Sequence, residues 1–526
     1  MSRPDAPSSR LASRLITGLL LAAVFLLAIL SATLFVDPNW RHSVDSAIYL
    51  LTAKSLSLGE GYTYLGHPFF VRPPALSWCL AHIMGETWDF ALYNQLIQIA
   101  VAASFGTILL AMSRLHGWCA AALITLLFGL NPLSLNHQNS ILAEYPFLAL
   151  FFAATWLLSR HRDGRQPGTL AALTGAILLA ASVAFRTVGV LFLPGLVLLS
   201  ALGLNGRRSE STDTTGEPNR WQGLLVAVLV TLSLVPWALY SREAATNAER
   251  PSTQLLMFDY STALLHTNPS DPNSPFVDSA GWFERIGNNL TEMSHTVGYA
   301  FLGGPPNEAL STFGPGSMIV TVLLGACLLY TVLSRRSAMD LYAAISVLVL
   351  LLYFTSADRL LLPLIPLILS SVVYTAHRIG QFLAKRTTIP EPSALLIGAF
   401  ALALGAMSLT RIEESRTLSA TKRRFQRDDL ATADWVRRHL PEDARLLHEK
   451  GAVLSVLSGR TTYTYRNLPG PWPEGCPEVD YAIFSPRPRR EDTETLVAAV
   501  AGPPTLVPFK WKGQMSNIRI YPLDDG

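Results

Sequence analysis

The sequence predicts a polytopic α-helical membrane protein that ends in a small α/β domain. Half of its 526 residues are hydrophobic and only 15% are charged, whereas an ordinary soluble domain carries about 25% charged residues. The charges are unevenly distributed, because long uncharged stretches alternate with short stretches that are crowded with charge. After residue 410 this pattern stops, and short apolar runs separated by turn residues replace the long ones.

A helix needs about 20 apolar residues to cross a hydrocarbon layer of about 30 Å. Eleven stretches of the chain approach or reach this length: 15–36, 92–112, 117–134, 142–159, 169–185, 187–204, 221–239, 315–334, 338–356, 360–377 and 392–409. The first follows three arginines and is longer than the apolar core of about 7–15 residues in a secretory signal. We therefore interpret 15–36 as a retained first transmembrane helix, with a signal peptide as the alternative.

The basic residues of the loops indicate the orientation. With the N-terminus in the cytoplasm, every cytoplasmic loop contains Lys or Arg, as the positive-inside rule requires. These residues are Arg114, Arg160, Arg162, Arg165, Arg207, Arg208, Arg220, Arg335, Arg336, Arg378, Lys385 and Arg386. Two long loops, 37–91 and 240–314, then face outward. About 11 spans, an odd number, place the C-terminus outside as well. The chain thus divides into a transmembrane domain, 1–410, and a soluble extracytoplasmic domain, 411–526.

The C-terminal segment has the pattern of a small α/β domain. It begins with a charged stretch, followed by an amphipathic helix from Leu430 to Leu440 that Pro441 ends. Its apolar runs are Val453–Leu457, Tyr481–Phe484, Leu496–Val500, Leu506–Phe509 and Ile518–Tyr521. Turn residues separate these runs, as in a fold that contains strands. Because a domain of about 100 residues is near the lower size for independent folding, we expect it to lean on the membrane domain.

Two classes of function are not supported by the composition. The formal net charge is only +3 and basic residues do not alternate with aromatic ones, so we expect no nucleic-acid partner. The four cysteines are scattered and form no CxxC pair, so neither a zinc site nor a disulfide framework is expected.

The first outer loop carries polar residues at helical spacing. Asp45, Tyr49 and Thr52 fall on one face of a predicted helix, and apolar residues form a stripe beside them. Gly59 and Gly61 end this helix, which we expect to lie in the outer membrane interface. The alternative for Asp45 is a helix N-cap, a position that Asp favours.

Three arginines lie on the predicted outer face, against the positive-inside bias. Arg72 precedes Pro73 and Pro74, which disfavour a helix and keep its approach extended. Arg186 lies in a tight turn between two spans, and Arg359 begins the tenth span. Guanidinium groups suit phosphate because they bind it in a bidentate manner. The alternatives are a lipid-headgroup contact for Arg72 and, for each arginine, a cap on helix carbonyls or an ion pair with Asp45, Glu144 or Asp358.

A second acid, Glu144, lies at the mouth of an apolar helix with no basic neighbour in the sequence. Ionisable groups at the membrane edge are costly, so their presence is informative. An interhelical hydrogen bond or snorkelling to the surface is the alternative for Glu144. Three arginines and two carboxylates on one face favour an active cleft over these structural roles.

Such a cleft suits a reaction between a lipid-borne phosphate and a polar acceptor. Positive charge would stabilise the phosphate as it leaves, and a carboxylate can act as the general base for the acceptor. Because the cleft faces away from cytoplasmic nucleotides, a membrane-anchored donor is the expected source of the transferred group.

The order of these motifs resembles the GT-C superfamily of membrane glycosyltransferases. Within it, the chain is most similar to the protein O-mannosyltransferase and aminoarabinose-transferase-like (glycosyltransferase 39-type) families of bacteria. The motifs are D-x-x-x-Y after the first span, a G-x-G-Y turn, R-P-P, a second acid at the head of a later span, and R-x-L-L-P-x-x-P opening a late span. The resemblance covers roughly residues 10–410.

The resemblance implies transfer of a hexosyl or pentosyl group from a polyprenyl-phosphate carrier to a protein, lipid or glycan acceptor, usually with inversion. The reaction would take place on the outer side of the bacterial cytoplasmic (inner) membrane. The implied site contains Asp45 and Glu144 as catalytic acids or bases, and Tyr49, Arg72, Arg186 and Arg359 as substrate-binding residues.

One departure concerns metals. Ser46 follows Asp45 where many relatives have a second acid, which weakens the case for a metal site built on adjacent carboxylates. Some relatives bind a divalent cation and others use none, so the sequence leaves metal dependence open.

Two other classes of function remain as alternatives. A transporter or flippase of lipid-linked sugars would place polar groups near the bilayer midplane in broken helices of paired repeats, and we find neither repeats nor midplane charges. A non-catalytic envelope assembly protein would leave Glu144 and Arg359 unexplained. No motif specifies the sugar or the acceptor.

Overall fold

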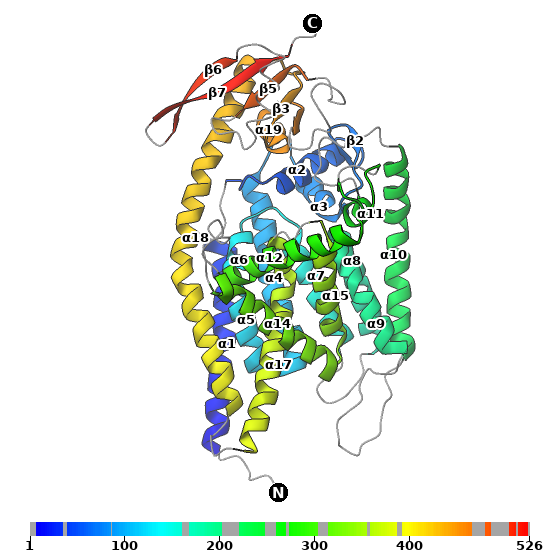
Figure 1. The fold of residues 1–526 in the computed structure, drawn as a ribbon, viewed down its shortest axis with the longest axis vertical. Coiled ribbons are helices and arrows are strands. Elements are labelled where there is room, and N and C mark those ends of the chain that lie inside the picture. The colour runs from blue at the N-terminus through cyan, green and yellow to red at the C-terminus, as the bar shows by residue number, and fades with distance from the viewer. Residues whose placement is uncertain are drawn as a thin grey trace.

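The computed structural model describes residues 7–34, 39–85, 87–159, 168–201, 220–247, 259–269, 273–302, 314–354, 358–386, 392–464, 479–484, 504–511 and 514–523. Most of these residues are helical. Apolar helices form an elongated bundle, and a mixed β-sheet covers the end of the bundle that is opposite the N-terminus (Figure 1).

The elements before the second outer loop are α1 (Pro7–Leu34), α2 (Val44–Ser57), β1 (Thr63–Tyr64), β2 (His67–Pro68), α3 (Ala75–Ile83), α4 (Phe90–His116), α5 (Trp118–Gly129), α6 (Pro132–His137), α7 (Glu144–Leu158), α8 (Thr169–Phe185), η1 (Thr187–Leu191), α9 (Phe192–Ala201) and α10 (Arg220–Asn247). The following helices are α11 (Tyr260–Leu265), α12 (Ser279–Leu302), α14 (Gly314–Ser334), α15 (Ala338–Leu352), α16 (Asp358–Leu361), η2 (Leu362–Leu364), α17 (Ile365–Ala384) and α18 (Pro392–His439). The C-terminal elements are β3 (Leu446–His448), α19 (Gly451–Ser458), β4 (Thr462–Thr464), β5 (Tyr481–Phe484), β6 (Thr505–Trp511) and β7 (Gln514–Pro522).

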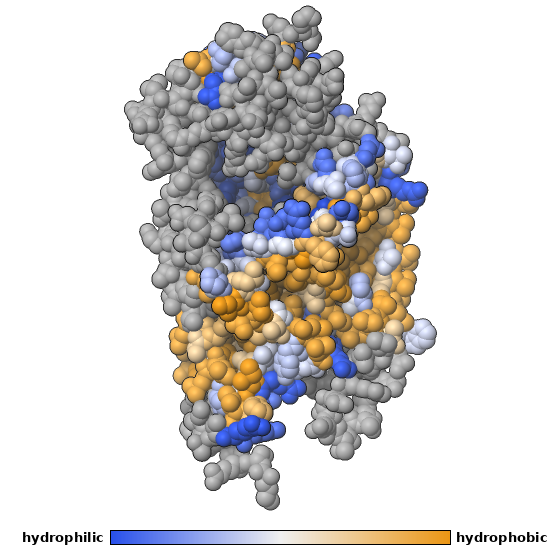
Figure 2. Space-filling view, in the orientation of Figure 1, coloured by the Kyte–Doolittle hydropathy of each residue, from blue (hydrophilic) through white to orange (hydrophobic). Residues whose placement is uncertain are grey.

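Each of the eleven predicted spans overlaps an apolar helix in the described part of the chain. Four of these helices are long and apolar enough to cross a membrane: Phe90–His116, Trp221–Thr246, Pro315–Ser334 and Arg359–Ala384. Seven further apolar helices are shorter, at 10–17 residues. On the face drawn in Figure 2, hydrophobic residues form a broad band with hydrophilic residues on both sides of it along the long axis. The prediction of many apolar helices is confirmed, while the number of spans and their orientation stay predictions.

Close helix contacts follow from small residues at turns. Gly117 separates α4 from α5 with φ of 82°, a left-handed conformation that glycine adopts without strain. The two helices therefore form the tight hairpin expected there. α1 packs against both α4 and α5, so the first apolar helix belongs to the bundle.

α2 differs from the expected interfacial helix. Its N-cap is Ser43, whose hydroxyl accepts a hydrogen bond from the backbone N–H of Ser46, so Asp45 is not the cap. The helix is buried on most of its circumference, because α3 packs on one part of it and α19 of the C-terminal segment on another. Protein rather than lipid therefore covers its apolar stripe.

α18 connects the bundle to the C-terminal sheet without interruption (Figure 1). Its 48 residues would extend about 72 Å at 1.5 Å per residue, more than twice the thickness of a hydrocarbon layer of about 30 Å. The last predicted span and the predicted helix at 430–440 are thus parts of one helix. The boundary proposed between residues 410 and 411 lies inside it.

The C-terminal sheet has the strand order β4-β3-β5-β7-β6. β3 pairs in parallel with β4 and β5, whereas β7 pairs antiparallel with β5 and β6. The apolar run Val453–Leu457 lies in α19, which connects β3 to β4. The runs at 481–484, 506–509 and 518–521 lie in β5, β6 and β7. The run at 496–500 lies outside the described residues. Buried residues of α18, including Ala433 and Val436, pack against the sheet and α19.

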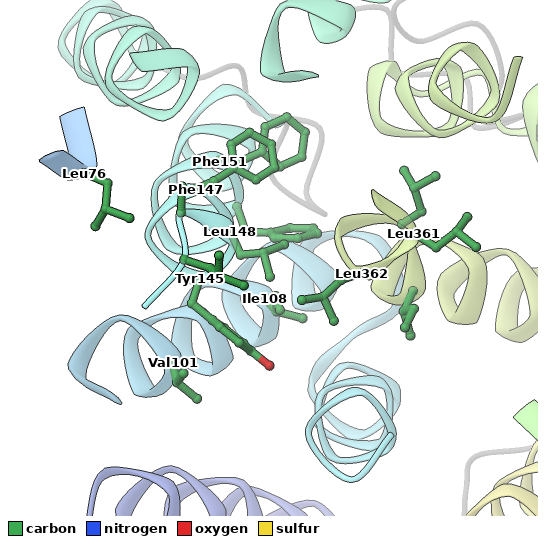
Figure 3. Packing of buried hydrophobic residues seen from close by; sticks show 14 of the residues in the cluster. Leu76, Val101, Ile108, Tyr145, Phe147, Leu148, Phe151, Leu361 and Leu362 are labelled. Carbon is green, nitrogen blue, oxygen red and sulfur yellow. The ribbon is translucent and has the colours of Figure 1, made fainter. Parts of the chain in front are cut away.

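A single apolar core runs through the bundle and supports the outer ends of its helices. Figure 3 shows Phe147, Leu148 and Phe151 of α7 beside Leu361 and Leu362 of the α16–η2 turn, all of them buried. α4 packs along α7 and contributes further residues to the same core. This packing is relevant to the site, since α7 begins at Glu144 and α16 contains Arg359.

Candidate active site

The six predicted site residues come from five separate parts of the chain. Asp45 and Tyr49 lie on the first turns of α2, and Arg72 lies in the extended segment before α3. Glu144 is the first residue of α7, and Arg186 connects α8 to η1. The sixth residue, Arg359, lies in α16 and joins the cluster through its ion pair with Asp45.

The carboxylate of Asp45 is shared between two arginines. Its Oδ1 accepts a hydrogen bond from Arg72 Nη2, and its Oδ2 forms an ion pair with Arg359 Nη1. All three side chains are largely covered, with 18–27% of each exposed. The Arg72 guanidinium also lies over the ring of Tyr49, 5.3 Å from its centroid. This is the position for a cation–π contact.

The two arginines control the ionisation of Asp45. Burial acts to raise the pKa of this carboxyl, but Arg359 and Arg72 outweigh burial and lower the pKa to about 2. Burial alone would lower the pKa of Arg72, because burial disfavours the charged guanidinium. The negative charge of Asp45 outweighs burial and raises this pKa. All three groups are therefore charged at neutral pH.

A second ion pair lies beside the first. Arg186 Nη1 lies 2.6 Å from Glu144 Oε1, and only 13% of the arginine side chain and 4% of the glutamate side chain are exposed. Arg186 Nη1 is buried. Although it lies close to Glu144 Oε1, the geometry of this contact is not that of a hydrogen bond. Nη1 keeps donor capacity that a ligand oxygen could use.

The two ion pairs form one electrostatic cluster. Tyr49 lies within electrostatic reach of Arg72, Glu144, Arg186 and Arg359, and Asp45 within reach of Arg186. Three guanidinium groups against two carboxylates leave an excess of one positive charge. Burial raises the pKa of the Tyr49 phenol, although Arg72 opposes that effect, so the phenol stays protonated and able to donate a hydrogen bond.

Lys54 and His67, two further ionisable residues of the segment 37–91, lie away from the cluster. Lys54 is exposed and its Nζ lies 5.8 Å from the ring centroid of Trp88. His67 is half-buried in β2, paired with Tyr64 of β1. Neither residue is joined to the cluster by a contact in the structure.

The described residues do not form a typical metal centre. No group of three or more His, Cys, Asp or Glu side chains lies together in the described part of the chain. Both Asp45 oxygens face arginines, and Ser46 donates its hydroxyl to the backbone carbonyl of Ser43. This donor set does not fit a divalent cation, and we derive no step through one.

The sequence motifs missed several tyrosines around the cluster. The phenols of Tyr64 and Tyr260 lie within electrostatic reach of Arg72, and that of Tyr353 lies within reach of Arg359 and Arg186 as well. Tyr260 begins α11 in the second outer loop, where Asp259 caps the helix. For Tyr260, the available signal in the sequence was an Asp-Tyr pair before a short apolar run. Asp is common at the start of helices, so this signal does not single out a site residue.

Comparison with solved structures finds membrane glycosyltransferases of the GT-C superfamily. The chain aligns with ArnT from Cupriavidus metallidurans in the apo state over 95% of its own length and 97% of that chain, with 14% identity and a TM-score of 0.54. It aligns with the Archaeoglobus fulgidus oligosaccharyltransferase in the apo form over 95% and 74%, with 10% identity and a TM-score of 0.50. ArnT from Cupriavidus metallidurans bound to undecaprenyl phosphate aligns over 95% and 97%, with 14% identity and a TM-score of 0.49.

No protein-family model matches the chain, and no curated protein sequence matches it. The structural alignments extend over nearly the whole chain, at identities that show the fold alone. The chain therefore has the fold of GT-C membrane glycosyltransferases, and the resemblance found in its motifs is confirmed at the level of the fold.

Proposed function

We propose that this protein transfers a glycosyl group from a polyprenyl-phosphate-linked donor to an acceptor on the outer side of the bacterial cytoplasmic membrane. The observation that carries the proposal is the carboxylate of Asp45 shared between Arg72 and Arg359, with the Glu144–Arg186 pair in the same cluster. The GT-C fold supports the reaction class.

The charge of the cluster matches a lipid-linked sugar phosphate. Such a donor is a phosphodiester with one negative charge, which would balance the excess positive charge of the site. When the sugar leaves, the phosphate gains a second negative charge. Buried guanidinium groups that already face this position stabilise that charge without reorganising. The donor's polyprenyl chain would remain among the apolar helices or in lipid.

Donor binding would release Asp45 from its arginines. Without a ligand, Asp45 holds Arg72 and Arg359, and its low pKa makes it a weak base. A donor phosphate competes for the same guanidinium groups, because its oxygens can also accept two parallel hydrogen bonds from an arginine. As the arginines turn to the phosphate, the carboxylate loses the charges that lowered its pKa, and it becomes a stronger base when the donor is in place.

The reaction then follows from the released carboxylate. The acceptor hydroxyl or amine attacks the anomeric carbon, and its proton passes to Asp45. The bond between the anomeric carbon and the phosphate oxygen breaks, and the phosphate leaves with the electron pair. Glu144 keeps Arg186 directed at the cluster, and the Tyr49 phenol can donate a hydrogen bond to a phosphate oxygen.

The test is transfer of radiolabelled sugar from synthetic polyprenyl-phosphate donors by the purified protein. Asp45→Asn should lower the rate at least about 100-fold, as expected for loss of a general base. Asp89→Asn is the matched control. Asp89 lies in the same outer loop and caps α4 by accepting from the Leu92 N–H, a role that Asn also fills. Transfer by the wild type and the control, but not by Asp45→Asn, supports the proposal.

No transfer and no donor hydrolysis by folded wild-type protein, across a broad panel of sugars, would contradict it. That result would favour a transporter of lipid-linked sugars or a non-catalytic assembly protein.

A further inference from the structure

The segment that leads into α2 is held on several sides. The indole N–H of Trp40 donates to Ser46 Oγ at 2.9 Å, and Arg41 Nη2 donates to Asn136 Oδ1 at 2.7 Å, in α6. His42 Nδ1 lies 3.0 Å from Asp429 Oδ2, in α18. The next residue, Ser43, caps α2, and Asp45 is two positions further along. The position of Asp45 thus depends on contacts made by the residues just before it.

The contact of His42 belongs to a buried polar junction with the C-terminal domain. Asp429 is 9% exposed, and His42 has 5% of its side chain exposed. Lys450 Nζ lies 3.1 Å from both oxygens of Asp429. Burial acts to raise the pKa of Asp429, but His42 and Lys450 outweigh it and lower the pKa. The carboxylate is therefore charged and is contacted from two separate segments.

This junction lies at the edge of the C-terminal sheet where α/β folds bind their ligands. The parallel strands lie in the order β4-β3-β5, so the strand that follows β3 in the chain lies on one side of it and the next strand lies on the other side. In open α/β sheets, ligands bind at the carboxyl ends of the strands where this reversal occurs. Lys450 and α19 follow the carboxyl end of β3. In this protein, α2 and the segment before it are next to that edge.

An apolar contact accompanies the polar junction. Ala452, Val453 and Val456 of α19 are buried in the same core cluster as Ala47 and Ile48 of α2. α19 can begin so close to β4 because Gly451 has no side chain: a Cβ there would lie 2.6 Å from the backbone of Tyr463. α2 therefore packs against α19 at this edge of the sheet.

We propose that the C-terminal domain positions the catalytic carboxylate of Asp45, and that Asp429 is the positioning residue, acting through His42. Separation of the two domains would leave the buried His42 ring without Asp429 and would leave the Asp429 carboxylate with Lys450 alone, which is costly for buried polar groups. The junction therefore selects one placement of the first turn of α2. The proposal rests on the proposed function only in calling Asp45 a reacting group.

The experiment uses the full chain and two readouts, hydrogen exchange of residues 40–47 without substrate and steady-state sugar transfer. Asp429→Asn should raise exchange in this segment at least about 10-fold. It should lower kcat about 10-fold to 100-fold with the donor KM within about twofold, because misplacement by about 1 Å affects the reaction more than binding. Asp434→Asn is the control, since Asp434 is more exposed and pairs only with Arg437 and Arg438 of its own helix.

Three further variants test whether Asp429 acts through His42. His42→Ala should reproduce the effect of Asp429→Asn, and the double variant should be no worse than either single one. His42→Asn, which keeps a donor near the position of Nδ1, should restore most of the rate. Equal hydrogen exchange of residues 40–47 in Asp429→Asn and Asp434→Asn would overturn the proposal. A double variant whose loss of kcat is the sum of the two single losses, in free energy, would overturn it as well.

The two proposals fail in different ways. Suppose that the wild type transfers no sugar while Asp429→Asn still raises hydrogen exchange at residues 40–47. The proposed function would then be removed, and the positioning role of Asp429 would be retained. Normal transfer with unchanged exchange and kcat in Asp429→Asn would retain the function and remove the positioning role.

Discussion

Asp45 is the residue on which the account depends, because its carboxylate keeps two buried guanidinium groups in one place. Its lowered pKa makes stability depend on pH. A carboxyl whose folded pKa is below its unfolded value stabilises the protein above the unfolded pKa, and this stabilisation is lost as the pH falls through the folded pKa.

The pKa of Asp45 falls from about 4 to about 2 on folding, which corresponds to at most about 3 kcal/mol of stability. We expect thermal unfolding in detergent to show Asp45→Asn as less stable than the wild type at pH 7. The difference should narrow between pH 4 and pH 2, in proportion to the protonation of Asp45. A difference that stays constant over this range would show that the ion pairs of Asp45 do not stabilise the folded chain.

Arg72 is predicted to bind the donor phosphate through its planar fork. Arg72→Lys keeps the charge but loses bidentate geometry, so we expect the donor KM to rise about 10-fold to 100-fold with a smaller change in kcat. Arg437→Lys is the matched control, because Arg437 is exposed on α18. An unchanged donor KM in Arg72→Lys would remove this residue from the donor site.

The six residues were predicted because charged groups on the predicted outer face, and a tyrosine one helical turn from Asp45, stand out in the sequence. Their roles in the site stay predictions. Ion pairs with Asp45 and Glu144 were one alternative for the arginines, but the sequence did not indicate which arginine meets which acid, since Asp45 and Arg359 are more than 300 positions apart. Asp429 was missed for the same reason. It lies in a stretch of the sequence crowded with charge, a pattern usually found in solvated segments, and only the folded chain brings it to His42.

At the scale of elements, the length of the apolar stretches predicted the apolar helices, and the short gap between the stretches 92–112 and 117–134 predicted the α4–α5 hairpin. The sequence did not indicate that α2 would be enclosed by α3 and α19, because an apolar stripe has the same pattern whether protein or lipid covers it. The continuity of α18 was also missed, since its charged middle resembles a linker.

The close approach of α19 to β4 gives an element-scale prediction. Gly451→Ala should lower the thermal midpoint of the protein and raise exchange in α2, because its Cβ would lie 2.6 Å from the Tyr463 backbone. Gly398→Ala in α18 is the control, since a Cβ there has no neighbour within 4 Å and alanine favours the helix. Equal midpoints for the two variants would show that α19 can move away from β4 without loss.

The whole molecule has the GT-C fold, which hydropathy and motif order predicted together. The orientation stays a prediction that cysteine labelling can test in a variant without the four native cysteines. A membrane-impermeant maleimide should label Lys54→Cys in intact cells, because Lys54 is exposed and lies in the segment 37–91 that is predicted to face outward. It should label Arg336→Cys, exposed between α14 and α15, only after permeabilisation. The reverse pattern would invert the topology.

The central claim is that a donor phosphate replaces Asp45 on Arg72 and Arg359. The most direct measurement is the affinity of purified wild type and Asp45→Asn for polyprenyl phosphate, by titration in detergent. Because the carboxylate no longer competes for the arginines, we predict that Asp45→Asn binds polyprenyl phosphate about 10-fold more tightly while transferring no sugar. Weaker binding by Asp45→Asn, or no binding by either protein, would contradict the account.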